Sequence, residues 1–159
     1  PTLCGLLLGK AARAREKGVE LSFDPACRMD RTFTGLEEAE LISIIGNLLD
    51  HATEAHQRAP LPHAPVELLI TLSASELIIE VADCGVGITP AIRERIFERG
   101  VTTKTRGDHG IGLYLIHSYV TQAGGCVEIA DNAPRGTIFS LFIPARHPTQ
   151  ELKETHYAT

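Results

Sequence analysis

The sequence lacks an excess of positive charge, closely paired cysteines and any long apolar run, and each absence excludes a class of protein. A formal net charge of -5 at pH 7 provides no broad basic surface for DNA or RNA, so we expect no nucleic-acid partner. No two cysteines have the C-x-x-C spacing of a zinc site, and they are too scattered for a secreted disulfide scaffold. We therefore expect reduced, mostly buried thiols in a cytosolic setting, at Cys4, Cys27, Cys84 and Cys126.

The sequence also has no signal for membrane insertion or secretion. No run of about 18 apolar residues occurs, which is the length that a membrane helix needs. The first residues lack the basic start, apolar centre and small-residue cleavage site of a signal peptide. The chain as given is therefore expected to be soluble.

The length of 159 residues suits one domain, and no internal repeat divides it. Residues 1–17 predict an amphipathic helix that begins without a cap, which suggests the end of a longer upstream helix. Residues 18–145 contain the other regular patterns and are expected to form the domain. The polar residues 146–159 are expected to be a disordered tail.

Apolar periodicity predicts the order strand, helix, two strands, short helix, loop, helix, two strands. A helix over 35–59 follows from one apolar stripe with spacings of three and four, formed by Leu41, Ile45, Leu48, Ala52 and Ala55. The other expected elements are strands over 19–23, 66–72, 77–82, 126–130 and 137–143, and helices over 91–97 and 113–123. Because hairpin-joined strands alternate with helices, we predict an α/β (α+β) sandwich, a mixed, largely antiparallel sheet with helices on one face.

Two glycine-bearing segments are the most informative part of the sequence. DCGVGI at 83–88 follows a predicted strand, and GDHGIGL at 107–113 precedes a predicted helix. Glycine permits close approach of backbone N–H groups to a ligand, and amides at a helix start suit phosphate oxygens. Either segment alone is also typical of an ordinary turn. Together they predict two walls of a nucleotide pocket.

Polar residues accompany the glycines. Asn47, His51 and Glu54 share a helix face beside the apolar stripe, where they line either a pocket or a solvated surface. Asp83, at a strand end, suits a hydrogen bond from an exocyclic amine such as that of adenine, although Asp before Gly is also a common turn. Lys104, in a basic loop, is either a cation that closes over a triphosphate or a lone surface lysine.

In this order the segments resemble the ATP-binding catalytic domain of sensor histidine kinases, in the Bergerat-type superfamily that includes gyrase, Hsp90 and MutL. The resemblance covers residues 35–144. Its boxes are GNLLDHATEA (46–55, N box), DCGVGI (G1 box), RIFERGVTTK (95–104, F box) and GDHGIGL (G2 box), followed by a final Gly-Thr at 136–137. The segments ELISIIGNLLDHATEA, IFERGVTTK and GIGLYLIHSYV are similar to the citrate and C4-dicarboxylate sensor branch. The start of the chain, LLLGKAARAREKGVEL, is similar to the end of the dimerisation helix and the first strand in that branch, so residues 1–17 are expected to end an upstream dimerisation helix.

The resemblance implies a role for each matching residue. Asp83 would bind the adenine amine of ATP, Gly85 and Gly87 would let the base lie against the backbone, and Thr137 would support it through water. The residues facing the phosphates would be Asn47, His51, Lys104, Gly110 and Gly112. Asn47 and His51 would also face Mg2+.

Two features depart from the family pattern. His51 stands where the N box has a second asparagine, and imidazole is a poorer partner for Mg2+ than an amide oxygen. No histidine precedes Gly18, so the phosphate acceptor is expected on a helix outside this sequence. Of the remaining scattered histidines, only His109, in the expected lid, is a candidate to lie near the ligand.

The leading hypothesis is a protein-histidine kinase domain that transfers the γ-phosphate of ATP to a histidine on its own dimerisation domain, for relay to a response regulator. The full-length protein would be a homodimer anchored in the inner (cell) membrane, with this domain in the cytoplasm. One alternative is a nucleotide-binding regulatory module without turnover, because of His51. Another is an ATPase or serine kinase of the same superfamily.

Overall fold

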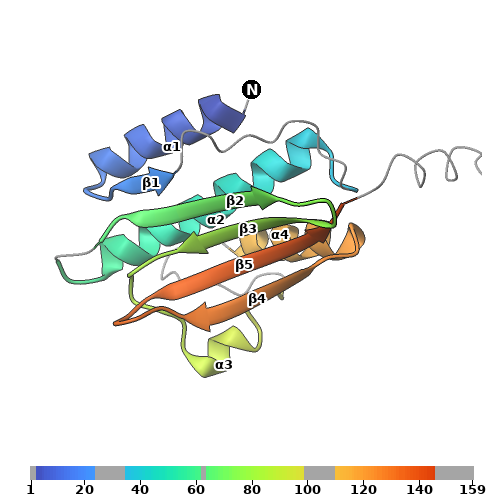
Figure 1. Cartoon of the computed structure of the whole chain (residues 1–159). Coiled ribbons are helices and arrows are strands. Elements are labelled where there is room, and N and C mark those ends of the chain that lie inside the picture. The colour runs from blue at the N-terminus through green and yellow to red at the C-terminus, as the bar shows by residue number, and fades with distance from the viewer. Residues whose placement is uncertain (1–2, 24–34, 62–63, 99–109, 146–159) are drawn as a thin grey trace, which may run out of the picture.

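The structure is a computed structural model that describes residues 3–23, 35–61, 64–98 and 110–145. Figure 1 shows one sheet lying in front of a layer of helices. The helices are α1 (Leu3–Glu16), α2 (Glu38–Arg58), α3 (Pro90–Arg93) and α4 (Gly110–Gln122), and the strands are β1 (Leu21–Phe23), β2 (Val66–Leu72), β3 (Glu76–Ala82), β4 (Cys126–Asp131) and β5 (Thr137–Pro144). None of these described helices combines the length and apolar character needed to cross a membrane.

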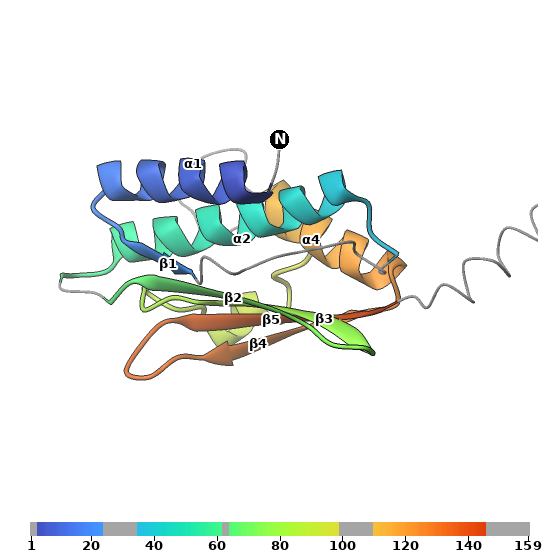
Figure 2. The ribbon, with the colours of Figure 1, turned by 45° about the horizontal axis from the view of Figure 1, so that its top comes forward.

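The sheet has five strands in the order β1-β2-β3-β5-β4. β1 is parallel to β2, and every other neighbouring pair is antiparallel. Helices α1, α2 and α4 lie on one face of the sheet (Figure 2), so the predicted sandwich is confirmed. Because β3 and β5 are antiparallel neighbours, the end of β3 lies beside the start of β5, where Ala82 pairs with Ile138.

Helix α2 is the central helix of the layer. It begins at Glu38 rather than at residue 35, because the chain turns at Glu37, whose backbone N–H donates to the Glu40 side chain at 3.0 Å. The whole predicted stripe is buried, at Leu41, Ile45, Leu48, Ala52 and Ala55. The stripe joins the core that the helices form with the sheet.

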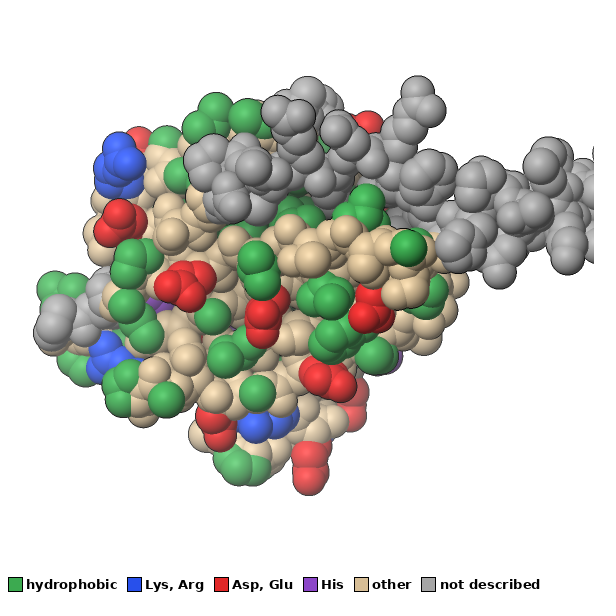
Figure 3. Space-filling model, in the orientation of Figure 1, with side chains coloured by type: hydrophobic (Ala, Val, Ile, Leu, Met, Phe, Trp, Pro, Cys, Tyr) green, Lys and Arg blue, Asp and Glu red, His purple; other side chains and the backbone are tan. Residues whose placement is uncertain are grey.

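Alternate residues of the central strands face the helices. This inner set is buried and comprises Val66, Leu68, Leu77, Ile79, Val81, Phe139, Leu141 and Ile143. The intervening residues form the outer face of the sheet, where acidic and apolar side chains are interspersed (Figure 3). Residues that follow one another along a strand therefore belong to two different environments.

Two helix boundaries near the glycine segments differ from the prediction. α3 ends at Arg93 rather than at residue 97, because the next residues form three-residue turns, as in the 3.4 Å bond from Ile96 N to Arg93 O. α4 begins at Gly110 rather than at residue 113, so Gly112 lies within its first turn. The N–H groups of a first turn have no acceptor within the helix, which leaves them available to a ligand.

The prediction of mostly buried cysteines is wrong for those that the structure describes. Cys4 and Cys126 are exposed, and Cys84 is half-buried, all as free thiols. Cys126 lies across from Phe142 on the outer face of the sheet, where no described helix covers it. Cys27 lies outside the described residues.

Candidate nucleotide site

Asp83 follows β3 directly and is only 1% exposed. Its Oδ1 accepts the backbone N–H of Gly85 at 2.9 Å and that of Thr137 at 3.2 Å. The backbone N–H of Asp83 donates to the carbonyl oxygen of Thr137 at 2.9 Å. One carboxylate oxygen is thus fixed both by its own turn and by the neighbouring strand.

The other carboxylate oxygen of Asp83, Oδ2, is buried and has no hydrogen-bond partner within the part of the chain that the structure describes. Burial raises the pKa of Asp83, and the N–H groups of Gly85 and Thr137 oppose this effect only in part. A buried acceptor without a donor costs free energy. A ligand amine that donates to Oδ2 would remove this cost, as an adenine amino group can.

Close packing around this carboxylate requires glycine. A β-carbon at Gly85 would lie 2.5 Å from the carbonyl carbon of Ala55 in α2, and one at Gly136 would overlap the carbonyl oxygen of Asp83. Gly87 and Gly136 have positive φ angles of 77° and 107°. Residues with a β-carbon are disfavoured at positive φ, so glycine is required at these two positions of the pocket wall.

Asn47, on α2, reaches the first turn of α4. Its Nδ2 donates to the carbonyl oxygen of Ser43 at 2.8 Å and contacts Ser43 Oγ at 3.3 Å. Its Oδ1 faces α4, where a β-carbon at Gly112 would lie 2.9 Å away. The fold therefore brings the N box and the G2 box into contact.

The carboxylate and the helix start lie at two points along α2. The Asp83 segment contacts α2 at Ala55, and α4 contacts it at Asn47. A separation of eight residues corresponds to roughly 12 Å along a helix. This distance is comparable with the span of an adenine nucleotide from its base to its phosphates.

His51 is 6% exposed and packs toward the sheet. Its ring meets the ring of Phe139, in β5, edge to face, with centroids 5.3 Å apart and an interplanar angle of 79°. His51 thus contributes to the core as well as to the N box.

The remaining predicted residues divide into two groups. Thr137 is buried and bonded to Asp83, and Gly110 is the first residue of α4. Lys104 and His109 lie outside the described residues. The described residues therefore include the segments predicted to hold the adenine, but not Lys104 and His109 of the expected lid.

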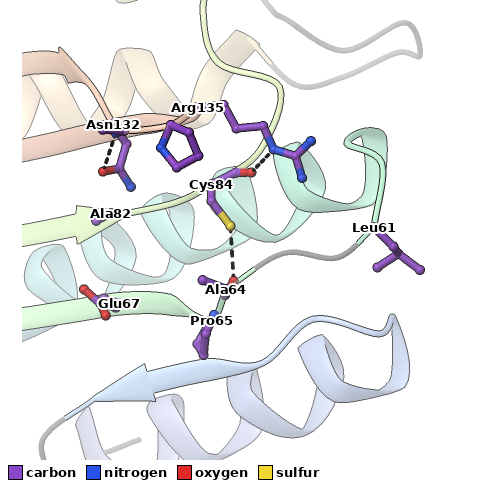
Figure 4. Close-up of a pocket in the computed structure, with 10 residues that line it drawn as sticks. Leu61, Ala64, Pro65, Glu67, Ala82, Cys84, Asn132 and Arg135 are labelled. Carbon is purple, nitrogen blue, oxygen red and sulfur yellow. Dashed lines mark hydrogen bonds between the residues drawn. The ribbon is translucent and has the colours of Figure 1, made fainter.

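The sequence does not predict the residues that hydrogen-bond to the backbone of the segment after β3. Arg135 Nε donates to the carbonyl oxygen of Cys84 at 2.9 Å (Figure 4), and Asn132 Nδ2 donates to that of Asp83 at 2.8 Å. His56 Nε2 accepts the backbone N–H of Cys84 at 2.8 Å. No spacing in the sequence marks these residues, because the contacts form only when the helix end and the β4–β5 turn meet the segment.

A cavity of about 520 Å³ lies on the other side of the same segment. Its lining includes Ala82 and Cys84, which alternate with the inward-facing Asp83, and the turn residues Asn132 and Arg135 (Figure 4). It belongs to the outer side of the sheet and is separate from the Asp83 carboxylate.

The described residues contain no group of three or more His, Cys, Asp or Glu side chains that could hold a metal ion. Oδ1 of Asn47 is an oxygen donor of the kind that Mg2+ prefers. His51 offers only nitrogen and packs against Phe139. A magnesium ion here would depend largely on oxygens of the nucleotide and of water.

Comparison with known proteins identifies the family. Residues 37–147 match the profile of the histidine kinase-, DNA gyrase B- and HSP90-like ATPases. The chain is 56% identical over 142 residues to the sensor histidine kinase CitA of Klebsiella pneumoniae, covering 89% of this chain and 26% of that protein. It is 45% identical over 148 residues to the sensor histidine kinase DpiB of Escherichia coli, covering 92% of this chain and 27% of that protein. The chain thus spans about a quarter of the length of these relatives.

Solved structures agree with this assignment. Full-length ShkA in complex with AMPPNP superposes with a TM-score of 0.68 at 26% identity, over 90% of this chain and 30% of that chain. The mycobacterial sensor histidine kinase MprB has the same fold, with a TM-score of 0.65 at 22% identity, over 92% of this chain and 97% of that chain. The predicted resemblance, including the citrate and C4-dicarboxylate branch, is confirmed, and the chain belongs to the family of histidine kinase-, DNA gyrase B- and HSP90-like ATPases.

Proposed function

We propose that this domain binds ATP with its adenine at Asp83 and transfers the γ-phosphoryl group to a histidine on the dimerisation domain of the same sensor kinase. The observation that carries the proposal is the buried Oδ2 of Asp83, which has no donor among the described residues, while Oδ1 is held by Gly85 and Thr137. Adenine carries at C6 the amino group that such an acceptor recognises, whereas guanine carries an oxygen acceptor at that position. The family match and the relatives named as sensor histidine kinases support the assignment.

In this proposal the pocket runs along α2. The adenine lies at Asp83, with Gly85 and Gly87 against its ring and Thr137 reaching it through water. The phosphates lie toward Asn47 and the first turn of α4, where Gly110 and Gly112 present backbone amides. Lys104 approaches a phosphate from the lid. Backbone amides at a helix start suit this task because they combine free donors with the positive end of the helix dipole.

Mg2+ is proposed as the cofactor, with Asn47 Oδ1 as its protein oxygen. The ion would neutralise charge on the phosphates when it is bound. His51 fits this role less well than an asparagine, because its ring packs against Phe139 and supplies no oxygen. The position of Asn47 is itself well defined, since its Nδ2 is bonded to Ser43.

The chemistry required of the domain is mainly positioning. An imidazole nitrogen of the acceptor forms a bond to the γ-phosphorus while the bond from phosphorus to the β–γ bridging oxygen breaks, and ADP leaves. The acceptor ring releases its remaining ring proton to a base on its own domain. The residues proposed here bind and orient ATP, and none of them needs to form a covalent bond.

The partners follow from the same proposal. The dimerisation domain supplies the phosphate-accepting histidine, and a response regulator receives the phosphoryl group. The full-length protein is proposed to be a membrane-anchored homodimer with this domain in the cytoplasm, and to sense citrate or a C4-dicarboxylate. The names of the relatives support the kinase role, and one relative is named as a probable C4-dicarboxylate sensor kinase.

A second candidate function is a nucleotide-binding regulatory module without turnover. The observation that favours it is the edge-to-face packing of His51 on Phe139, which draws the second N-box position toward the core. Such a module would retain the adenine site and bind nucleotide without help from Mg2+.

The test is a calorimetric titration of the chain with ATP and ADP, first with Mg2+ and then with a chelator. Wild type is expected to bind both nucleotides. Asp83→Asn is expected to lose at least about tenfold in affinity, because the adenine amine would face the amide nitrogen of Asn, which is also a donor. Glu128→Gln, on the outer face, is the matched control and should bind as wild type. Unchanged affinity in Asp83→Asn would refute the adenine assignment, and metal-independent binding would favour the regulatory module.

A further inference from the structure

The last turn of α2 is hydrogen-bonded to the segment that follows Asp83. His56 is fully buried, at 0% exposure, and its Nε2 accepts the backbone N–H of Cys84 at 2.8 Å. The carbonyl oxygen of Ala55 accepts the backbone N–H of Val86 at 3.3 Å. The first of these bonds comes from a side chain, so it depends on the chemical state of that side chain.

The hydrogen bond defines the state of the His56 ring. A backbone N–H can only donate, so Nε2 must carry a lone pair. In a neutral ring the proton is therefore on Nδ1. A protonated ring has N–H groups at both nitrogens, and Nε2–H would then oppose the N–H of Cys84.

We propose that His56 is a positioning residue for nucleotide binding: its neutral Nε2 holds Cys84, and thereby the Asp83 carboxylate, so that proton uptake by His56 weakens binding. The proposal rests on the proposed role of Asp83 at the adenine. The link between the two residues is short, because Asp83 and Cys84 are adjacent and the bond of Asp83 Oδ1 to Gly85 N–H closes the same turn.

Charged and titratable groups lie on the elements next to this contact. Asp83 and Cys84 lie on the segment after β3, and Arg135, on the β4–β5 turn, donates to the carbonyl oxygen of Cys84 at 2.9 Å. Arg58 follows two residues later on α2 and is exposed. The proposal concerns the loss of the Nε2 acceptor when the His56 ring takes up a proton.

The test compares ADP affinity of three forms of the chain between pH 8 and pH 5.5. His56→Gln places an amide oxygen near the position of Nε2 and does not titrate, whereas His56→Leu fills the space without an acceptor. At pH 8, His56→Gln should bind within about threefold of wild type, and His56→Leu should bind about tenfold more weakly, since the Cys84 N–H would be buried without an acceptor. As the pH falls, wild type should lose affinity relative to His56→Gln by about tenfold.

The ratio of affinities at each pH removes the titration of ADP itself and of Asp83, because both forms share them. His117→Gln removes an exposed histidine of α4 that stacks on Phe97, and it should keep the wild-type pH profile. Thermal unfolding of each variant establishes that the domain is folded at the pH of measurement. A His56→Gln profile parallel to wild type, or wild-type affinity in His56→Leu, would overturn the proposal. If Asp83→Asn also binds normally, the adenine assignment fails as well, and the two failures are thus told apart.

Discussion

Gly112 lies against the side chain of Asn47, so closely that a β-carbon at position 112 would come within 2.9 Å of Oδ1. This approach joins the first turn of α4 to the middle of α2. It also means that the proposed phosphate amides and the proposed magnesium oxygen cannot be moved independently. A change at either residue should affect the phosphate end of the pocket and leave the adenine end intact.

Gly112→Ala is therefore expected to weaken binding of Mg-ATP by about tenfold, because the methyl group displaces Asn47 Oδ1 or shifts α4. Calorimetry measures the affinity for Mg-ATP and for adenosine, which lacks phosphates and should bind as to wild type. Gly9→Ala, on α1, is the matched control, because nothing lies within 4 Å of its β-carbon. An equal loss of affinity for adenosine and for Mg-ATP would show that position 112 affects the adenine end of the pocket as well as the phosphate end.

A second prediction concerns Gly136, whose β-carbon would overlap the carbonyl oxygen of Asp83 and whose φ is 107°. Gly136→Ala should destabilise the domain by about 3 kcal/mol or more, because it adds steric overlap to backbone strain. Urea unfolding measures the loss. Gly18→Ala separates the two causes, since Gly18 has a φ of 77° but open space around it, and it should cost only about 1 kcal/mol. Similar losses in both variants would show that the overlap is relieved at little cost.

Much of this arrangement could be predicted from the sequence. The apolar stripe from Leu41 to Ala55 predicts the central helix, and the strand patterns predict β2, β3 and β5. The segments around Asp83 and Thr137 were predicted to form one site, and the antiparallel pairing of β3 with β5 brings them together.

The rest depended on contacts between distant residues. His56, Asn132 and Arg135 hold the Asp83 segment through single hydrogen bonds, which leave no periodic signal. The sequence pattern predicts a start of α4 at residue 113, three residues too late, because two of the first three residues of the helix are glycines, which are poor helix formers. The exposure of Cys126 depends on which face of the sheet the helices cover, and a short strand pattern does not specify that.

A third prediction follows from the burial of Asp83, which raises its pKa above the value of 3.8 for a free side chain. Its contribution to stability is fully present below the pKa of the unfolded chain and is lost as the pH rises through the higher folded pKa. Asp83→Asn carries no such charge, so the unliganded variant should gain stability relative to wild type as the pH rises through the folded pKa of Asp83. Urea unfolding of both forms, from about pH 4 to pH 7, measures the difference.

The same variant should bind nucleotide poorly, so function and stability change in opposite directions at Asp83. Glu128→Gln provides the comparison for an exposed carboxylate, and its stability relative to wild type should vary little with pH. If Asp83→Asn instead became progressively less stable than wild type as the pH rises, the ionised carboxylate would be stabilising the fold. Burial would then not be the dominant influence on Asp83.

The last prediction concerns His51, which stands where the resemblance implies an asparagine and packs edge to face on Phe139. His51→Asn should raise the Mg2+-dependent part of ATP affinity, because an amide oxygen is a better magnesium ligand than an imidazole nitrogen. It should also lower the thermal midpoint, because the smaller polar side chain leaves the Phe139 ring less well packed.

Titrations of ATP with and without Mg2+, together with thermal unfolding, measure both effects. His51→Leu is the matched control: it keeps an apolar contact with Phe139 and offers no ligand atom, so its thermal midpoint and the Mg2+-dependent part of its ATP affinity should both stay close to those of wild type. If His51→Asn binds ATP equally with and without the ion, the N box of this chain does not reach the metal. The phosphates would then be held by the amides of α4 and the lid alone, as the regulatory alternative requires.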